Sequence, residues 1–329
     1  MRSKTSTTPT TPTDHRLLLP LLLPIFLLPL LLPTFLLPIF VLPHLLLASP
    51  LPRSPTSSFP LLSGGKPVGF KLCVGRPEEV AALVRAFVEV GPEAAPDFIT
   101  VDGAEGGTGA APPEFSNRVG MPLHEGLTVV KGLLRGAGLR GSRAEIGGGQ
   151  VKLIASGRVV NGFDMVKLLA LGADVCNSAR AMMFALGCIQ ALACNTNRCP
   201  TGITTNDPML MAGLDVQDKA LRVQQYQAKT VNTALEIVGA CGLDHPSQIT
   251  TEHIWKRFDG FEAKAYADIY KEVPVGCLLD GSTGGKGGRR RPVFEEWWDA
   301  SAGLLKQSHA LGNKSISMKV HGGVGRMSE

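Results

Sequence analysis

After residue 66 the chain alternates short apolar runs with longer amphipathic stretches. The short runs, bounded by glycine or charged residues, predict strands at 68–74, 98–101, 151–155 and 173–176. Helical spacing of apolar residues predicts helices at 77–90, 123–134 and 161–171, one from about 179, and two longer ones near 215–240 and 251–271. In the first helix, Pro77 lies near the start and apolar residues return at positions 80, 83, 84, 87 and 88.

Strand and helix repeated in this order are typical of βα units around a parallel sheet. Both a (β/α)8 barrel and an open doubly wound sheet fit the pattern. In either architecture, the loops that follow the strands gather at the carboxyl edge of the sheet. The glycine-rich and polar segments of this chain lie in those loops, so we expect a functional site there.

Residues 1–62 differ in composition from the rest. All 38 glycines follow residue 63, whereas half of the 24 prolines precede it. Residues 17–52 carry no Lys, Arg, Asp or Glu, and a membrane span takes about 20 apolar residues. Prolines every four or five residues nevertheless disfavour a regular helix. Residues 1–62 have three interpretations: a membrane anchor, a cleaved targeting segment, or a low-complexity repeat outside the fold. The sequence leaves open whether the protein is cytoplasmic or organellar.

The rest divides into a globular domain at 63–275 and a partly flexible extension at 276–329. The formal net charge is +5, and much of the excess lies in the basic run 286–291. A nucleic-acid surface would need a broader basic face with interleaved aromatic residues. We therefore expect no nucleic-acid partner.

Three cysteines, Cys188, Cys194 and Cys199, follow one another at C-x5-C-x4-C spacing, and Pro200 comes next. Thiolates held this close in a loop are typical ligands of an iron–sulfur cluster, and three of them favour a three-iron cluster. The alternative is that they are small buried hydrophobic residues. The odd count of 7 cysteines disfavours a disulfide framework, and zinc would want four ligands.

The glycine-rich loop 102–110 follows the second predicted strand and does not match a dinucleotide fingerprint. Its glycines would let the backbone approach a flat ligand, or they would serve a tight turn without a ligand. Lys71 lies inside an apolar strand. Its ammonium would hold negative charge on a reduced flavin or a substrate carboxylate if it pointed into a barrel mouth, or it would reach to solvent.

Two further turns, Ser156-Gly157-Arg158 and 177–180, follow the last two strands. Free backbone N–H groups at such turns bind phosphate, and barrels favour phosphate sites after their last two strands. Ordinary helix capping by Asn177 or Ser178 is the alternative.

Taken together, these segments resemble the FMN-binding domain of glutamate synthase, and more narrowly the stand-alone FMN-binding glutamate synthase family. The segments are Phe70-Lys71-Leu72, 102–110, 173–178 and 187–202. The resemblance covers about residues 63–275, and Thr-Asn-Arg-Cys-Pro-Thr-Gly at 196–202 is its most specific part.

The resemblance implies an α/β fold of the (β/α)8 TIM-barrel type, with only the last four βα units and C-terminal helices in this chain. It implies FMN at the barrel mouth and a [3Fe-4S] cluster beside it. The implied activity is that of an oxidoreductase that forms L-glutamate from 2-oxoglutarate and ammonia or glutamine nitrogen. Its electrons would come from ferredoxin or an NAD(P)H-oxidising subunit. Membrane association is not implied by the resemblance; under the anchor interpretation it would run through residues 17–52.

The resemblance also implies a role for each residue that occupies a position of the family's motifs. Lys71 and Glu105 would be catalytic residues near the flavin and the 2-oxo acid. The cluster ligands would be Cys188, Cys194 and Cys199. The remaining cofactor-binding residues would be Gly106, Gly107, Thr108 and Gly109 along the flavin, and Ser156, Gly157, Asn177, Ser178 and Ala179 near its phosphate.

The chain also departs from the family pattern. Glu105 stands where full glutamate synthases have Asp, the glutamine-hydrolysing domain is absent, and 141–149 resembles an insertion. Half a barrel would leave two open strand edges, so a truncated non-catalytic fragment or a cofactor-binding subunit is the alternative function. Another FMN barrel oxidoreductase, acting on 2-hydroxy acids, is less favoured because Ala104 and Glu105 stand where it would need His and a nearby Arg.

Overall fold

The computed structural model describes residues 66–105, 114, 117–141, 151–258, 260–279 and 293–321, with side chains in the last segment up to 307. The chain divides into two units, 1–36 and 37–329, and every described residue belongs to the second. Residues 1–62, the glycine loop from 106 to 109 and nearly all of the 141–149 segment therefore lie outside the described residues.

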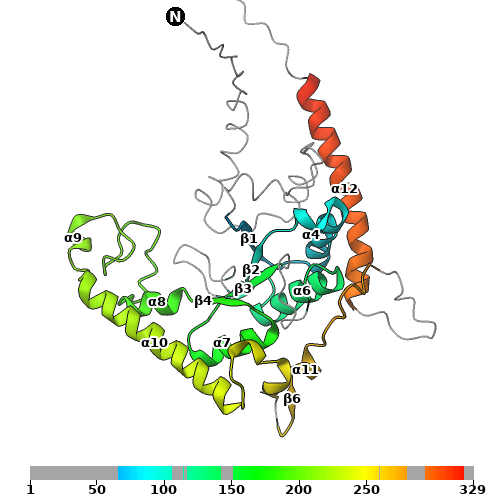
Figure 1. The fold of residues 1–329 in the computed structure, drawn as a ribbon. Helices are drawn as coiled ribbons and strands as arrows, with labels where there is room; N and C mark the ends of the chain where they lie inside the picture. Colours follow the sequence, from blue (N-terminus) through cyan, green and yellow to red (C-terminus); the bar gives the residue numbers. More distant parts are fainter. Residues whose placement is uncertain are drawn as a thin grey trace, which may run out of the picture. The chain divides into compact units, whose positions relative to one another are not determined.

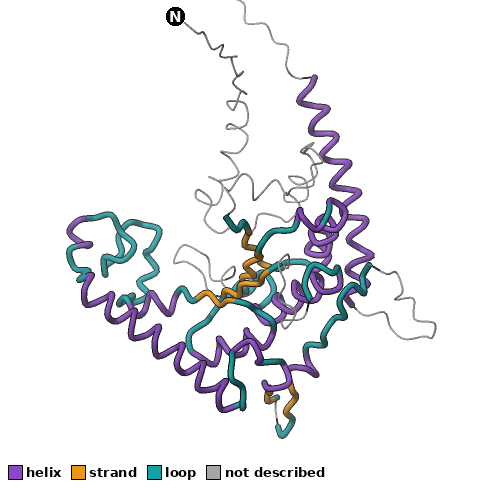
Figure 2. The backbone as a smooth tube through the Cα atoms, in the orientation of Figure 1, coloured by secondary structure: helices purple, strands orange, loops and turns teal. Residues whose placement is uncertain are grey.

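Four parallel strands form the centre of the described fold (Figures 1 and 2). They are β1 (Gly69–Cys73), β2 (Phe98–Asp102), β3 (Lys152–Ser156) and β4 (Val175–Asn177), and they pair in the order β1-β2-β3-β4. This sequential order is that of consecutive strands in a (β/α)8 barrel, whereas a doubly wound sheet reverses its order at a switch point. The predicted α/β fold with βα units of the barrel type is confirmed.

The crossover helices are α4 (Pro77–Val90), α6 (Leu123–Gly136) and α7 (Gly162–Leu171), and a short 3-10 turn, η1 (Pro92–Ala94), follows α4. Their apolar faces form one core with the sheet. Among its fully buried side chains are Leu83, Phe87, Leu127, Leu133, Leu153 and Leu171.

The register gives the sheet two unlike faces. Parallel partners point to the same side, so Leu72, Val101 and Ala155 share the face that packs in the core. Lys71 and Thr100 share the opposite face, which in a closed barrel is the interior. One face of the sheet is thus apolar and packed, whereas the other carries polar residues among apolar ones such as Ile154.

A buried ion pair holds β3 to the start of β4. Arg140 donates from Nη1 to Oδ2 of Asp174 at 2.7 Å, and from Nη2 to the Gly172 carbonyl at 2.9 Å. The same carboxylate oxygen accepts the Leu153 N–H at 2.8 Å. Burial of the Asp174 carboxyl raises its pKa, but the hydrogen bonds from Arg140 and Leu153 outweigh this and lower it overall.

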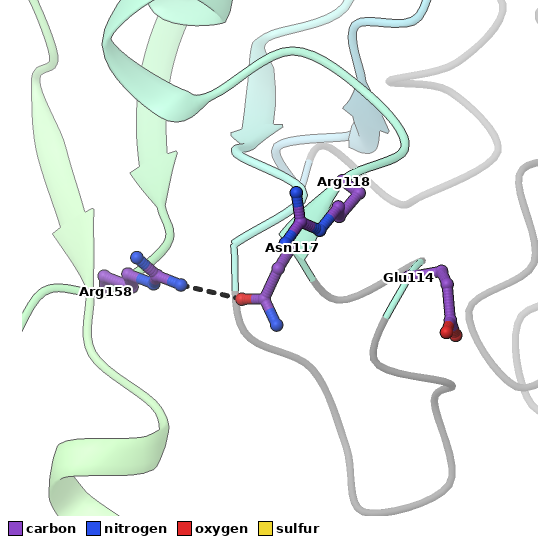
Figure 3. Close-up of a pocket in the computed structure, with 4 residues that line it drawn as sticks. All are labelled: Glu114, Asn117, Arg118 and Arg158. Carbon is purple, nitrogen blue, oxygen red and sulfur yellow. Dashed lines mark hydrogen bonds between the residues drawn. The ribbon is translucent and has the colours of Figure 1, made fainter.

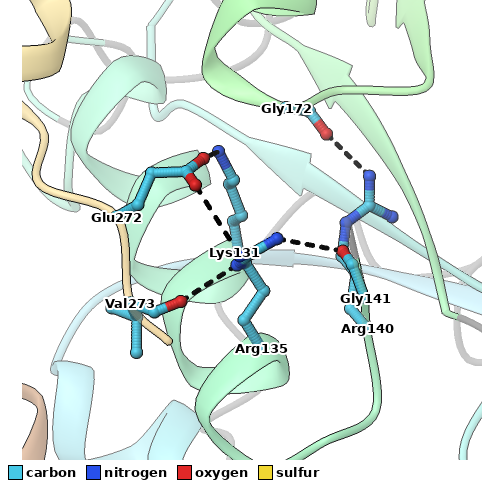
Figure 4. Close-up of polar contacts among 7 residues, drawn as sticks. All are labelled: Lys131, Arg135, Arg140, Gly141, Gly172, Glu272 and Val273. Atoms are coloured by element: carbon cyan, nitrogen blue, oxygen red, sulfur yellow. Dashed lines mark hydrogen bonds and ion pairs between the residues drawn. The ribbon is translucent and has the colours of Figure 1, made fainter. Parts of the chain in front are cut away.

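A second polar cluster ties α6 to the segment after residue 270 (Figure 4). Nζ of Lys131 and Nη2 of Arg135 lie 2.8 and 3.6 Å from the Glu272 carboxylate. Arg135 also donates to the carbonyls of Val273 and Gly141. These contacts cover the outer face of α6 with a segment far along the chain.

The chain after β4 forms α8 (Arg180–Ala185), α9 (Pro208–Met211) and the long helix α10 (Val216–Ala240). α10 packs on α7 and also contacts α8. Asp215 caps its start by accepting the N–H groups of Gln217 and Asp218. The helix predicted near 215–240 is confirmed.

The helix predicted near 251–271 is wrong. The region instead forms 3-10 turns η3 (Pro246–Gln248) and η4 (Thr251–His253), the antiparallel pair β5 (Trp255–Arg257) and β6 (Ala263–Ala265), and α11 (Tyr266–Ile269). Asp-Gly at 259–260 is a turn signal that outweighs the apolar spacing, and Gly260 has φ +81°.

A final helix, α12 (Val293–His321), packs along α4 and was not predicted. Arg85 of α4 donates to the Ser301 hydroxyl at 2.8 Å and to the Trp298 carbonyl at 2.6 Å. Its guanidinium also lies 4.3 Å from the centroid of the Trp298 ring. Across the described residues, no helix has the length and apolar character needed to cross a membrane.

Candidate functional site

The carboxyl ends of the four strands bring one row of side chains together. The register pairs Cys73 with Asp102, Asp102 with Ser156, and Ser156 with Asn177. These four residues face the same side as Lys71, opposite the packed core. We call Cys73, Asp102, Ser156 and Asn177 the strand-end row.

Lys71 is tied to this row. Its Nζ donates to Oδ2 of Asp102 at 2.9 Å, and the two side chains are 51% and 31% exposed. The Lys71 ammonium therefore reaches solvent, which was one of the two interpretations of this lysine. The Asp102 carboxylate on the neighbouring strand β2 holds it at the edge of the site. The sequence did not reveal Asp102 as its partner.

Glu105 lies at the start of α6, just beyond the strand-end row. Its Oε2 accepts the Leu123 N–H at 3.3 Å, and its Oε1 lies 4.0 Å from Nη1 of Arg158. A carboxylate at a helix N-terminus is favourable, since the first N–H groups have no partner within the helix. Glu105 thus links the turn after β2 to the turn after β3.

These two turns pack closely against each other. The Gly103 N–H donates to the Ser156 carbonyl at 3.0 Å. A Cβ on Gly103 would lie 2.5 Å from Cβ of Leu123, so only glycine fits there. Gly157 has φ +150°, and the non-glycine residues Ala104 and Arg158 have φ +49° and +47°.

A pocket of about 520 Å³ opens beside these turns, lined by Glu114, Asn117, Arg118 and Arg158 (Figure 3). Nη2 of Arg158 donates to Oδ1 of Asn117 at 2.7 Å. Glu114, Asn117 and Arg118 were not expected in a site, and Arg158 was expected only as part of a turn whose backbone would bind phosphate. Only Arg158 carried a signal, because it follows a glycine at a strand end.

Neither Asn177 nor Ser178, the polar residues after β4, caps the start of helix α8. Ala179 is the N-cap of α8, and no side chain accepts a hydrogen bond there. Ser178 instead donates its hydroxyl to the Val159 carbonyl at 2.8 Å, which joins this turn to the one after β3. The capping alternative is therefore wrong for Asn177 and Ser178, and Asn177 is exposed at the end of the strand-end row.

The three cysteines lie in the loop that follows α8. Cys188 and Cys194 are half-buried, and Cys199 is buried. The Cys188 Sγ accepts the Gln190 N–H at 3.4 Å. Positive φ angles at Gln190, Leu192 and Asn197 mark the sharp bends of this loop.

Hydroxyl groups surround the Cys199 sulfur. Oγ1 of Thr201 lies 3.3 Å from Sγ, and the hydrogen bond from this hydroxyl is the largest cause of a thiol pKa lowered to about 6. The Thr204 hydroxyl is buried and has no hydrogen-bond partner among the described residues, so Thr201 is the group that bonds to the sulfur. Cys199 is accordingly favoured as a thiolate near neutral pH, the form that binds metal.

The donor set fits an iron–sulfur cluster by its chemistry. Three thiols occupy one loop, one of them is stabilised as a thiolate, and a buried hydroxyl beside it is unsatisfied. Within the described ranges, no three His, Cys, Asp or Glu side chains are placed to hold a single metal ion. Thiolates on a cluster bind separate irons, so they need not converge on one point.

The family model and the curated relatives agree on one family. The family model described as the conserved region in glutamate synthase matches residues 61–244. The glutamate synthase large subunit-like protein YerD of Bacillus subtilis is 41% identical over 198 residues, which are 60% of this chain and 36% of that protein.

Two other relatives are named as glutamate synthases (NADPH). The archaeal-type protein of Thermotoga neapolitana is 32% identical over 54% of this chain and 32% of its own length. The archaeal protein of Methanocaldococcus jannaschii is 36% identical over 45% of this chain and 28% of its own length. The chain spans about a third of the length of the curated relatives it matches.

Among solved structures, a mandelate oxidase mutant with a monooxide FMN adduct matches 58% of this chain and 63% of that one. At 18% identity and a TM-score of 0.20, this likeness supports no conclusion. The family match rests on sequence and covers more than half of the 329 residues. The chain belongs to the glutamate synthase family.

Proposed function

We propose that this chain is a glutamate synthase-type oxidoreductase that depends on FMN and an iron–sulfur cluster. The reaction is the reductive formation of L-glutamate from 2-oxoglutarate and ammonia or glutamine nitrogen. The strand-end row supports this proposal most directly, because it gathers polar groups at the carboxyl edge of a parallel sheet. The cysteine loop follows the last strand of that same sheet.

FMN would be held by backbone groups at two turns. Ser156 and Gly157 at the end of β3, with Asn177, Ser178 and Ala179 after β4, would bind its phosphate. A Cβ on Gly157 would lie 3.4 Å from Leu123 and 3.5 Å from the Gly103 nitrogen, so the missing side chain leaves room for a ligand. When bound, FMN supplies the hydride that reduces the imine of 2-oxoglutarate. Gly106, Gly107, Thr108 and Gly109, outside the described residues, would line the flavin.

Lys71 would bind the carboxylate next to the reacting carbon. Asp102 fixes the ammonium at 2.9 Å, and an ammonium keeps two further donors for a ligand. Glu105 would act beside it, held by the Leu123 N–H.

Cys188, Cys194 and Cys199 would hold a [3Fe-4S] cluster that carries electrons to the flavin. The electron donor would be ferredoxin or an NAD(P)H-oxidising subunit. Two matched relatives carry NADPH in their names, which favours the second.

A cofactor-binding subunit that needs a partner is the alternative function. The chain spans only about a third of its curated relatives. Within the described residues, β1 and β4 each pair with one neighbour, so both are edge strands. A partner that supplied further strands would cover these edges.

Anaerobic reconstitution tests the proposal. The full chain is treated with FMN, iron and sulfide, and flavin, iron and sulfide are then quantified alongside the absorbance and electron paramagnetic resonance spectra. The expected product holds one FMN and about three irons per chain. It should form L-glutamate from 2-oxoglutarate and ammonium when reduced methyl viologen is the donor. Full cofactor content without turnover would favour the partner-dependent alternative, and colourless protein would reject both.

A further inference from the structure

We propose that the hydroxyls of Thr201 and Thr204 donate hydrogen bonds to the sulfur atoms of the bound cluster and raise its reduction potential. The inference rests on the proposed function, in which Cys188, Cys194 and Cys199 hold a [3Fe-4S] cluster. It assigns to two residues that are not ligands the control of how readily the cluster takes an electron. The step concerned is the one-electron reduction of the cluster by the electron donor of the proposed function, and no bond forms or breaks in it.

The Thr201 hydroxyl is placed to donate to a ligand sulfur. Its Oγ1 lies 3.3 Å from Sγ of Cys199, and in the free thiol either atom could be the donor. A sulfur that binds iron has lost its proton, so in the assembled site only the hydroxyl can donate. Cluster assembly therefore fixes the direction of this hydrogen bond.

The Thr204 hydroxyl is the second donor. It lies beside the Cys199 sulfur, is buried, and has no hydrogen-bond partner among the described residues. A buried hydroxyl without a partner is costly, and nearly all such groups in folded proteins are satisfied. An acceptor is therefore expected at this place, and the sulfur atoms of a cluster would supply it.

The local fold of the loop brings both hydroxyls to the sulfur. The chain turns tightly after Cys199, whose carbonyl accepts the Gly202 N–H at 3.2 Å. Gly202 has φ +73°, and a Cβ there would lie 2.5 Å from a backbone oxygen of α9, so only glycine fits. The Thr205 hydroxyl donates to the Asn197 carbonyl at 2.6 Å, which closes the turn. These contacts hold the turn against its own first residue.

The hydroxyls gather at one of the three proposed ligands. Cys188 accepts a backbone N–H, that of Gln190, at 3.4 Å. Cys199 has one hydroxyl at hydrogen-bond distance and a second, unsatisfied one beside it. Cys199 is also buried, and a hydrogen bond shielded from water is electrostatically stronger. We therefore expect the donors at Cys199 to have a large effect on the cluster.

Hydrogen bonds to sulfur are one of the factors that set the potential of an iron–sulfur cluster. An added electron increases the negative charge on the sulfur atoms, and a hydrogen bond to a charged acceptor is stronger than one to a neutral acceptor. The hydroxyls therefore stabilise the reduced cluster more than the oxidised one. The potential rises, so a weaker reductant can supply the electron.

A redox titration followed by electron paramagnetic resonance tests the inference on the full chain, reconstituted anaerobically with iron and sulfide. The signal of the oxidised three-iron cluster is lost on one-electron reduction, so the midpoint potential is measured without turnover. Thr201→Val and Thr204→Val keep the shape of the side chain and remove the hydroxyl. Each should shift the equilibrium about tenfold toward the oxidised cluster, which is about 59 mV for one electron. Iron content should stay at about three per chain.

Two sets of variants separate the hydroxyl from the shape of the loop. Thr201→Ser and Thr204→Ser retain the donor and should keep the wild-type potential. Thr196→Val is the matched control, because the Thr196 hydroxyl lies in the same loop and donates to the Ala193 carbonyl at 2.9 Å. This substitution should leave the potential unchanged.

Three results would overturn the inference. One is full iron content with an unchanged potential in both valine variants. Another is an equal shift in Thr196→Val or in the serine variants, which would assign the effect to the shape of the loop. The third is loss of iron from the valine variants alone, which would make the hydroxyls necessary for assembly rather than for the potential. All three leave the proposed function in place, whereas wild type that takes up no iron would reject that function together with the inference.

Discussion

Lys71 and Asp102 form a diagonal pair across the first two strands, with 2.9 Å between Nζ and Oδ2. Lys71 is in register with Thr100, and Asp102 is two residues further along β2. Diagonal neighbours on one face of a sheet lie within reach of a long side chain. The carboxylate therefore fixes an ammonium at the end of the site that we assign to substrate.

Replacing Lys71 by Met should separate function from stability. The pair is exposed, so we expect the free energy of unfolding to change by less than about 1 kcal/mol. Activity of the reconstituted protein should fall about 100-fold or more, because the substrate loses its fixed cation. Lys264→Met is the matched control, since Lys264 pairs with Glu262 at 2.7 Å and is similarly exposed. Equal activity in both variants would contradict the role of Lys71.

Replacing Cys199 by Ser should lower the iron content of the reconstituted protein from about three per chain toward zero. The reason is that a serine hydroxyl is a poor ligand for the iron of a cluster. Cys241→Ser is the control, because Cys241 is an exposed cysteine outside the loop. Iron analysis and the visible spectrum give the answer, and an unchanged iron content in Cys199→Ser would exclude this thiol as a ligand.

Replacing Gly157 by Ala should weaken both the fold and the flavin site. Its φ of +150° is unfavourable for a residue with a side chain, at a cost of about 1 kcal/mol. The added Cβ would also occupy space beside the Gly103 nitrogen. FMN affinity, measured by fluorescence quenching, should fall about tenfold, because a turn shifted by this strain no longer presents its N–H groups to the phosphate, and a tenfold loss takes only about 1.4 kcal/mol. Gly75→Ala, where a Cβ meets nothing within 4 Å, should match wild type.

Replacing Asp174 by Asn should alter the acid stability of the fold. The lowered pKa of Asp174 means that its stabilisation is complete above the ordinary Asp value of about 3.9. It is lost as the pH falls through the folded pKa. At pH 7 the variant should lose about 3 kcal/mol, because Arg140 is left buried without its charge partner. Urea unfolding from pH 7 to pH 3 should show this gap narrowing, and a constant gap would contradict the assignment. Asp244→Asn, at an exposed position, is the control.

The sequence predicted the sheet because the strands are short apolar runs that do not depend on distant partners for their pattern. Prediction from the sequence failed where contacts between distant segments determine the secondary structure. Residues 251–271 carry apolar residues at helical spacing, yet a turn at Gly260 and pairing of β5 with β6 prevail. α12 follows a glycine- and arginine-rich stretch and gains its order from packing on α4.

The candidate site was predictable in part for a similar reason. Lys71 and the cysteines stand out by local pattern. Asp102 as the partner of Lys71 needed the strand register, and Asn117 as the partner of Arg158 needed the contact between two turns that are far apart in the sequence. Residues whose role depends on a neighbour in space rather than in sequence leave no local signal.

The strand-end row has a consequence for how this family can change. The row is set by pairing within the sheet, whereas the turns beyond it contribute Glu105, Asn117 and Arg158. Insertions or replacements in those turns can reshape the pocket beside them and leave the row in place. The shape of the pocket can therefore differ among relatives while the edge of the sheet that carries the row stays the same.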